Sequence, residues 1–177
     1  GDNLCSAIHH VQSLKNIEIK WESKYPHSIG LFYSAITDFL GFMVNEGEYK
    51  VMGLAAFGKP KYYEELKKTF FYKDNSLFLD DSYYDFVRST SKSYSNKLAD
   101  LLKLSPRESH KHLDIATSNF QDYADLASSA QKLTEEILIK IFEHAHILTG
   151  EKRFIFTGGV AMNSVAIKKI SDLHFIE

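Results

Sequence analysis

Cysteine is nearly absent from this sequence, because Cys5 is the only one in 177 residues. A single thiol excludes an internal disulfide framework and favours a reducing compartment, so we expect a cytoplasmic protein. The net charge of −2 provides no basic surface for nucleic acid or for an anionic membrane. No apolar run approaches the roughly 20 residues of a membrane span, and no signal-peptide pattern occurs. We therefore expect neither nucleic acid nor a membrane among its partners.

The common motifs of nucleotide and metal chemistry are also missing. Neither a Walker loop (GxxxxGK followed by Ser or Thr) nor GxGxxG occurs, which excludes the two most frequent phosphate loops. HExxH, CxxC and GxSxG do not occur either, so the sequence gives no support to a zinc site or a hydrolase triad. The histidines that come in pairs have no clear third metal ligand, and we expect them at the surface. These pairs are His9 with His10, His110 with His112, and His144 with His146.

What the chain does contain is material for a packed core. Apolar residues make up 44% and aromatic residues 14%, including 13 Phe and 10 Tyr. This composition predicts a globular protein with a well-filled interior. The chain begins at Gly1 without a methionine, and residues 174–177 have the pattern of an opening strand. We therefore expect a piece of a longer protein that packs on the remainder of its own chain.

The first part of the chain predicts strands and then helices. Ile17, Ile19 and Trp21 alternate with charged residues, which predicts a half-buried strand. Ser28 is a plausible N-cap for a helix whose apolar positions recur at helical spacing until Gly41. A loop and a short helix are expected next, as far as a break at residues 58–60.

A charged helix is expected from Pro60. Residues 70–115 are expected to form a helical or irregular insert. Within it, residues 76–87 form either a hairpin or irregular structure, and a short helix ends before Pro106.

The last part of the chain shows the strongest pattern. Residues 118–149 keep one face apolar and end at Gly150, which predicts a long amphipathic helix. A strand is expected over residues 153–157, directly followed by two glycines and a helix to about Ser171. Helix, strand, turn and helix in this order are typical of an α/β fold.

Gly158 and Gly159 lie at the junction between that strand and that helix. A helix N-terminus offers unpaired N–H groups, and glycine lets a phosphate or sugar approach the main chain. Val160 follows the pair, and Asn163, about one turn into the helix, carries donor and acceptor groups. The combination suits a nucleotide, but spacing alone favours slightly a turn that is merely tight.

A second candidate is the segment NEGEYKVMGLA, residues 45–55. Glu46, Glu48 and Lys50 surround Gly47 in front of a small and apolar run. Lys50 is suited to hold an anion, and Glu46 to orient a sugar hydroxyl or a base. Taken alone, the pattern is more often a solvated turn with an ordinary ion pair.

Together, these two segments resemble the carbamoyltransferases of the NodU/CmcH type. The stretches that carry the resemblance are YPHSIGLFYSAITDFLGFMVNEGEYKVMGLAAFGKPKY, DLASSAQKLTEEIL and FTGGVAMNSVA. It covers residues 25–63 and 123–166 strongly, and residues 1–24 and 70–115 weakly. It implies an α/β fold of the ribonuclease-H-like, actin-like ATPase type, with a mixed sheet flanked by helices. Residues 1–177 would then be most of the second half of an N-terminal catalytic domain.

The resemblance also implies an activity. Such enzymes use carbamoyl phosphate and ATP, form a carbamoyl-adenylate, and transfer the carbamoyl group to a hydroxyl of an antibiotic, a nodulation factor or another natural product. Gly158, Gly159, Val160 and Asn163 match the GGVxxN motif of the nucleotide site. Glu46, Gly47 and Lys50 match the other motif of the pocket.

Several parts of such an enzyme are expected outside residues 1–177. An HxxxH pair and an aspartate, which hold a metal ion, generally iron, would lie before Gly1 and after Glu177. The smaller domain that produces the carbamoyl-adenylate would also follow Glu177. No metal ligands are therefore expected in this chain, which we expect to be inactive alone. One departure from the family pattern is that Ile167 and Lys168 stand where a second asparagine and a glycine are usual.

Two other functions remain open. One is the enzyme group that makes threonylcarbamoyl-adenosine in transfer RNA, which shares the fold but has a glycine-proline element in place of EGEYKVMGLA. The other is a non-catalytic nucleotide-binding or interaction module on the same scaffold, which the altered residues Ile167 and Lys168 keep open.

Overall fold

The structure is a computed structural model that describes residues 3–13, 15–86, 88–89, 91–109, 112–116 and 119–177. Position 118, where the long helix was expected to begin, and His110 lie outside the described residues. The elements in chain order are β1 (Leu4–Ser13), β2 (Asn16–Lys24), α1 (Ile29–Phe39), α2 (Glu48–Ala55), α3 (Tyr63–Thr69), β3 (Phe70–Lys73), β4 (Ser76–Leu79), η1 (Asp81–Tyr83), α4 (Asn96–Leu102), α5 (Phe120–Thr149), η2 (Gly159–Met162) and α6 (Ser164–Ser171).

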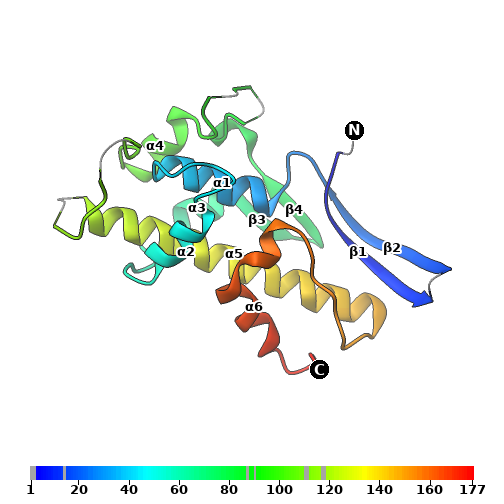
Figure 1. Ribbon diagram of the computed structural model, residues 1–177. Coiled ribbons are helices and arrows are strands. Elements are labelled where there is room, and N and C mark those ends of the chain that lie inside the picture. The colour runs from blue at the N-terminus through cyan, green and yellow to red at the C-terminus, as the bar shows by residue number, and fades with distance from the viewer. Residues whose placement is uncertain (1–2, 14, 87, 90, 110–111, 117–118) are drawn as a thin grey trace.

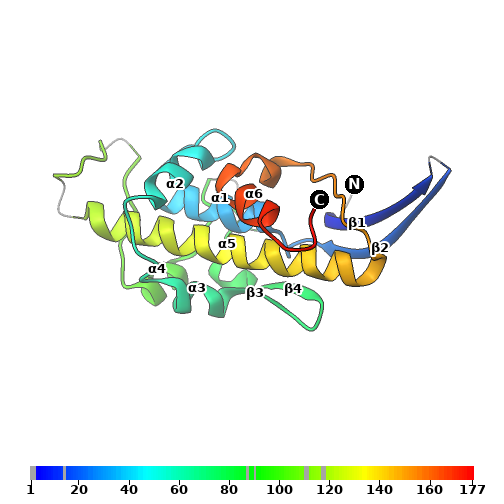
Figure 2. The same ribbon diagram turned by 90° about the horizontal axis from the view of Figure 1, so that it is seen from below.

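The long helix α5 is the element on which the others are assembled (Figure 1). It has 30 residues, which corresponds to about 45 Å of helix. Figure 2 shows α2 and α6 on one side of α5, and α3, α4 and the β3–β4 hairpin on the other. Gly150 ends the helix at a φ of 71°, a left-handed conformation that favours glycine. The long helix predicted to end at Gly150 is therefore confirmed over its described residues.

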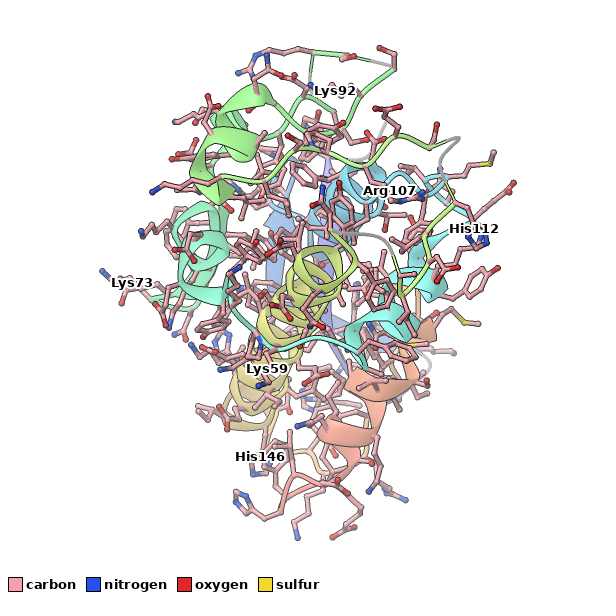
Figure 3. The ribbon with its side chains drawn as sticks, turned by 90° about the vertical axis from the view of Figure 1, so that its left-hand side faces the viewer. Lys59, Lys73, Lys92, Arg107, His112 and His146 are labelled. Atoms are coloured by element: carbon pink, nitrogen blue, oxygen red, sulfur yellow. The ribbon has the colours of Figure 1, made fainter. Side chains whose placement is uncertain are left out.

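Polar side chains on the buried face of α5 hold the loop that precedes α3. Asp125 accepts a hydrogen bond from the main-chain N–H of Lys59 at 2.8 Å, and Ser129 accepts one from that of Tyr62 at 2.9 Å. Figure 3 shows Lys59 beside α5. The loop lies so close to the helix that a Cβ at Gly58 would be 2.0 Å from the carbonyl oxygen of Ala124. The predicted break at residues 58–60 is therefore a point of main-chain contact with α5.

Helix α1 begins and ends at recognisable caps. The Ser28 hydroxyl accepts a hydrogen bond from the N–H of Leu31 at 3.2 Å, which confirms the predicted N-cap. At the other end, the Arg107 guanidinium donates to the carbonyl of Gly41 at 2.8 Å, and the main-chain N–H of Arg107 donates to the carbonyl of Phe39 at 2.9 Å. An arginine is well suited to satisfy carbonyls at a helix C-terminus. Residues far along the chain thus complete this helix.

The sheets are smaller than expected. Within the described residues, two antiparallel pairs occur, β1 with β2 and β3 with β4. The expected mixed sheet flanked by helices is therefore not seen, although the mixture of helices and strands agrees with an α/β chain. The actin-like form of the fold stays a prediction.

The β3–β4 hairpin follows from its turn. Asp74 and Asn75 have φ values of 51° and 58°, the two left-handed positions that a two-residue hairpin requires. The turn therefore pairs residues 70–73 with 76–79, whereas the sequence placed the candidate hairpin later, over 76–87. A 2.6 Å hydrogen bond from the indole N–H of Trp21 to the carbonyl of Asn75 joins β2 to this hairpin.

The strand expected over 17–21 is present within β2, but only Trp21 is half-buried as predicted. Ile17 and Ile19 are 56% and 52% exposed. The reason is that the outer part of the β1–β2 pair projects from the body, so these two side chains find no opposing layer (Figure 1).

Residues 153–157 do not form a strand among the described residues. Their side chains alternate as in a strand, with Phe154 and Phe156 packed on Phe142 at ring distances of 5.5 and 5.4 Å. Ile155 points away and is 98% exposed. The alternation predicted a strand, but a strand also needs a neighbour, and none pairs with this segment in the described part of the chain. The strand expected over 174–177 is likewise replaced by a turn.

No helix of the described residues is both long enough and apolar enough to cross a membrane.

The contact between the loop and α5 predicts opposite effects at two glycines. Gly58→Ala is expected to lower the free energy of unfolding by at least about 2 kcal/mol, because the methyl group meets main-chain atoms of α5. Gly53→Ala is the matched control. Gly53 is exposed on α2, a Cβ there would meet no atom within 4 Å, and the change should raise the free energy of unfolding by about 0.5–1 kcal/mol. Urea denaturation measures both; equal effects would show that the close approach at Gly58 is not real.

Candidate functional site

The glycine pair forms a turn whose two members differ. Gly158 has a φ of 100°, which an L-residue rarely adopts, so a glycine is needed there for the main chain alone. Gly159 has an ordinary φ, and a Cβ on either glycine would meet no atom within 4 Å. Both residues are exposed. A tight turn therefore explains Gly158 but does not explain Gly159.

The helix after this turn starts later than the sequence predicted. Gly159–Met162 form the single 3-10 turn η2, and α6 begins at Ser164. Asn163 is therefore the N-cap of α6 rather than a residue inside a helix. Its Oδ1 accepts a hydrogen bond from the N–H of Ala166 at 3.0 Å. Any loss of function on removing this side chain would combine loss of the cap with loss of a ligand contact.

The Asn163 amide is also paired with Gln131, a residue of α5 that is 5% exposed. Nε2 of Gln131 donates to Oδ1 of Asn163 at 3.0 Å, and Nδ2 of Asn163 donates to Oε1 of Gln131 at 2.9 Å. The Tyr33 hydroxyl donates to the same Oε1 at 2.9 Å, and Nε2 of Gln131 donates to Glu135 at 2.8 Å. The sequence does not single out Gln131, because a polar residue on a helix is most often at the surface.

The second motif surrounds the start of α2. Gly47 is the N-cap, and a Cβ there would lie 2.7 Å from Cβ of Phe42 and 2.8 Å from the carbonyl oxygen of Met43. Gly47 is therefore required by packing. The carboxylate of Glu48, rather than that of Glu46, closes the turn, since it accepts from the Ser34 hydroxyl and the Asn45 N–H at 2.9 Å each.

Glu46 and Lys50 are both exposed at this end of α2. The ammonium group of Lys50 lies 5.8 Å from the ring centres of Phe42 and Tyr49, a cation–π arrangement. Both side chains extend into solvent, where a ligand could reach them.

The two motifs, about 110 residues apart in sequence, lie side by side in the fold. The Ser164 hydroxyl at the start of α6 contacts the sulfur of Met52 in α2 at 3.7 Å. Val160 in η2 lies against α1, since a Cβ built on Gly30 would be 3.8 Å from its Cγ2. Figures 1 and 2 both show α2 beside the segment that leads into α6. The structure thus brings together the two elements that carry the predicted residues, and the assignment of those residues to a nucleotide stays a prediction.

A groove of about 890 Å³ ends at the glycine pair. It is lined by β1 over residues 5–11, by apolar side chains of α5, and by residues 153–160. At its other end, Nε2 of His10 lies 3.2 Å from Glu151. Much of the lining is apolar, and the main chain of residues 153–157 forms one wall. The groove therefore offers both apolar contacts and main-chain groups that have no partner strand among the described residues.

No group of three or more His, Cys, Asp or Glu side chains lies together in the described part of the chain. The prediction that His144 lies at the surface is wrong, because this residue is only 8% exposed. It lies on the inner face of α5, its Nδ1 is 2.7 Å from the Tyr72 hydroxyl, and burial lowers its pKa. Its partner in sequence, His146, is stacked on Phe175 at 4.4 Å (His146 is labelled in Figure 3).

Comparison with known proteins gives one family. The sequence model of the family described as carbamoyltransferase N-terminus matches residues 3–173. The uncharacterized protein sll1178 of Synechocystis is 34% identical over 148 residues, which is 82% of this chain and 23% of that protein. The nodulation protein NolNO of Sinorhizobium fredii is 30% identical over 148 residues, 82% of this chain and 19% of that protein. The nodulation protein NolO of Bradyrhizobium diazoefficiens is 30% identical over 137 residues, which is 77% of this chain and 22% of that protein. The chain thus spans only 19–23% of the length of these relatives.

Proposed function

This chain belongs to the carbamoyltransferase N-terminal family, and we propose that it is part of the catalytic domain of an ATP-dependent O-carbamoyltransferase. In the proposed reaction, water releases phosphate from carbamoyl phosphate, and the resulting carbamate displaces pyrophosphate from ATP to give a carbamoyl-adenylate. A hydroxyl of the acceptor then attacks the carbamoyl carbon, AMP leaves, and the hydroxyl proton is released. Two relatives are named nodulation proteins, which agrees with an acceptor of the nodulation-factor or natural-product type. A cytoplasmic location is part of this proposal.

The observation that carries the proposal is Gly159. This glycine has an ordinary φ and open space where a side chain would be, so neither conformation nor packing requires it. A ligand that approaches the main chain would require it, because a Cβ would occupy part of that space. The first N–H groups of a helical turn have no acceptor within it, and those of Gly159 and Val160 open η2. They are suited to donate to oxygens of the adenylate.

The remaining residues supply charge and orientation. An adenylate needs its phosphate anhydride to be held by main-chain donors and positive charge rather than attacked by a protein nucleophile. Lys50 is the cation of the neighbouring motif, and the exposed carboxylate of Glu46 can accept from ribose hydroxyls. The metal ligands that the resemblance implies are expected outside residues 1–177, so we assign no step to a metal ion.

The departure at Ile167 and Lys168 has a local explanation. Ile167 is half-buried against the core, and Lys168 pairs with Asp172 on the surface of α6. Neither side chain lines the groove that ends at the glycine pair. The departure therefore gives no specific reason to prefer a non-catalytic module over the transferase.

The proposal predicts that the two glycines can be separated by mutation in the full-length protein. Gly159→Ala should weaken ATP binding by about tenfold or more and leave the melting temperature unchanged, because the methyl group obstructs only the ligand. Gly158→Ala should lower both the ATP affinity and the melting temperature, because an alanine would be strained at the φ of 100° that this position has. Isothermal titration with ATP and thermal melting measure the two effects. Wild-type ATP affinity in Gly159→Ala would refute the site.

We also propose that the remainder of the longer chain covers the groove between β1 and residues 153–160. The proposal rests on Ile155, which is 98% exposed although its neighbours pack inward, and on the main chain beside it, which has no partner strand in the part of the chain that the structure describes. It also rests on the relatives, in which 77–81% of the chain lies outside the matched region. A segment that pairs with this wall would satisfy its N–H and C=O groups and bury Ile155.

This second proposal predicts a large effect at an apparently exposed residue. Ile155→Asp in the full-length protein should lower the free energy of unfolding by at least about 2 kcal/mol, because a charge would be buried. Ile115→Asp, at a position that is 70% exposed and outside the groove, is the control and should change it by less than about 0.5 kcal/mol. Denaturant unfolding measures both; a small effect at Ile155 would mean that the groove stays open.

A further inference from the structure

A chain of hydrogen-bonded side chains connects α5 to Asn163, the residue that follows the glycine turn and caps α6. It runs from Glu135 to Gln131, both on α5, then to Asn163, and ends at the main-chain N–H of Ala166 in α6. The separations are 2.8, 3.0 and 3.0 Å. The question is which way the two amides in the middle of this chain are oriented.

The two ends of the chain give the same answer. A carboxylate can only accept, so the amide nitrogen of Gln131 must face Glu135. A main-chain N–H can only donate, so the amide oxygen of Asn163 must face Ala166. With these orientations the paired amides of Gln131 and Asn163 each donate to the other's oxygen. Reversing either amide would place two donors or two acceptors against each other.

Tyr33 supports this orientation from α1. Burial raises the pKa of its hydroxyl well above the usual range, so it remains a donor at neutral pH. It donates to Oε1 of Gln131 at 2.9 Å, the atom that also accepts from Asn163. Both hydrogens and both lone-pair positions of the Gln131 amide are then in use. Gln131 therefore has no capacity left for a ligand.

Asn163 differs in one respect. Its oxygen accepts from Gln131 and from Ala166, and one amide hydrogen goes to Gln131. The other amide hydrogen makes no hydrogen bond of its own among the described residues, although the Tyr33 hydroxyl lies close enough to this amide to interact with it, and Asn163 is only half-buried, next to the glycine turn. What this residue can offer a ligand is thus a donor and not an acceptor.

We propose that Gln131 is a positioning residue of the nucleotide site: it fixes the Asn163 amide so that a single N–H is presented to an acceptor atom of the bound nucleotide. The inference rests on the proposed function. It adds a residue that contacts no ligand, and it assigns a direction to the hydrogen bond that Asn163 makes. It also predicts that Gln131 influences ATP only through Asn163.

Gln131→Glu in the full-length protein tests this. A carboxylate at position 131 can only accept, so it cannot donate to Oδ1 of Asn163 whichever way that amide is turned, and the amide pair that fixes Asn163 is lost. We expect ATP affinity to fall about tenfold in the wild-type background. In an Asn163→Ala background the same change should alter ATP affinity by less than about twofold, because the group through which it acts is gone. An equal loss in both backgrounds would overturn the proposal.

Gln121→Glu is the matched control. Gln121 is also on α5, and its Nε2 donates to Asp125, four residues on, at 2.7 Å, as Gln131 does to Glu135. It has no contact with Asn163, so thermal stability should fall in both variants and ATP affinity only in Gln131→Glu. Equal affinity losses in the two variants would overturn the proposal. If Gln131→Glu fails to fold, Gln131→Met replaces it, since methionine leaves the Asn163 amide free to turn. The same changes in ATP affinity are then expected in the wild-type and Asn163→Ala backgrounds.

The outcomes also distinguish this inference from the proposed function. If Gly159→Ala weakens ATP binding but Asn163→Ala does not, the nucleotide site stands and the role of Gln131 is wrong. If neither change affects ATP binding, the site itself is wrong.

Discussion

The buried face of α5 is the constraint on which the rest of the structure depends. Helices α1, α2, α3 and α6 all pack on it, although they come from both ends of the chain. The apolar side chains of α5 supply most of the burial energy but little positional information, because hydrophobic contact is not directional. Position is supplied by Asp125, Ser129 and Gln131, which hydrogen-bond to segments distant in sequence. Buried polar groups of this kind are costly unless they are paired, so they specify the partner that pairs them.

This arrangement explains how two motifs so far apart in sequence come to lie side by side. Asp125 and Ser129 hold the loop that follows α2, and Gln131 holds the cap of α6. One rigid helix thus sets the position of both motif elements relative to each other. The turn at Gly158 and Gly159 is attached to this helix through Asn163 while its own surface remains open. A preorganised turn with free main-chain donors is what binding an adenylate requires.

The parts of the fold that could be predicted from sequence are those decided locally. Ser28 and Gly150 mark helix ends through capping that depends on a few neighbouring residues, and the helices that they bound, α1 and α5, are confirmed. The prediction of a strand at 153–157 was wrong, because a strand needs a neighbouring strand to pair with, and the alternation of side chains does not show whether one is present. The roles of Gln131 and Glu135 were not predictable, since a polar residue on a helix is most often at the surface. Only the fold shows that the Gln131 amide is buried against Asn163.

The most direct test of the account is a crystal structure of the full-length protein with a non-hydrolysable ATP analogue. The account predicts an oxygen of the nucleotide within hydrogen-bond distance of the main-chain nitrogen of Gly159. It also predicts that Oδ1 of Asn163 still faces Ala166, with the free amide hydrogen on the nucleotide. A nucleotide bound elsewhere, with the glycine turn open to solvent as it is in the chain alone, would contradict the central claim.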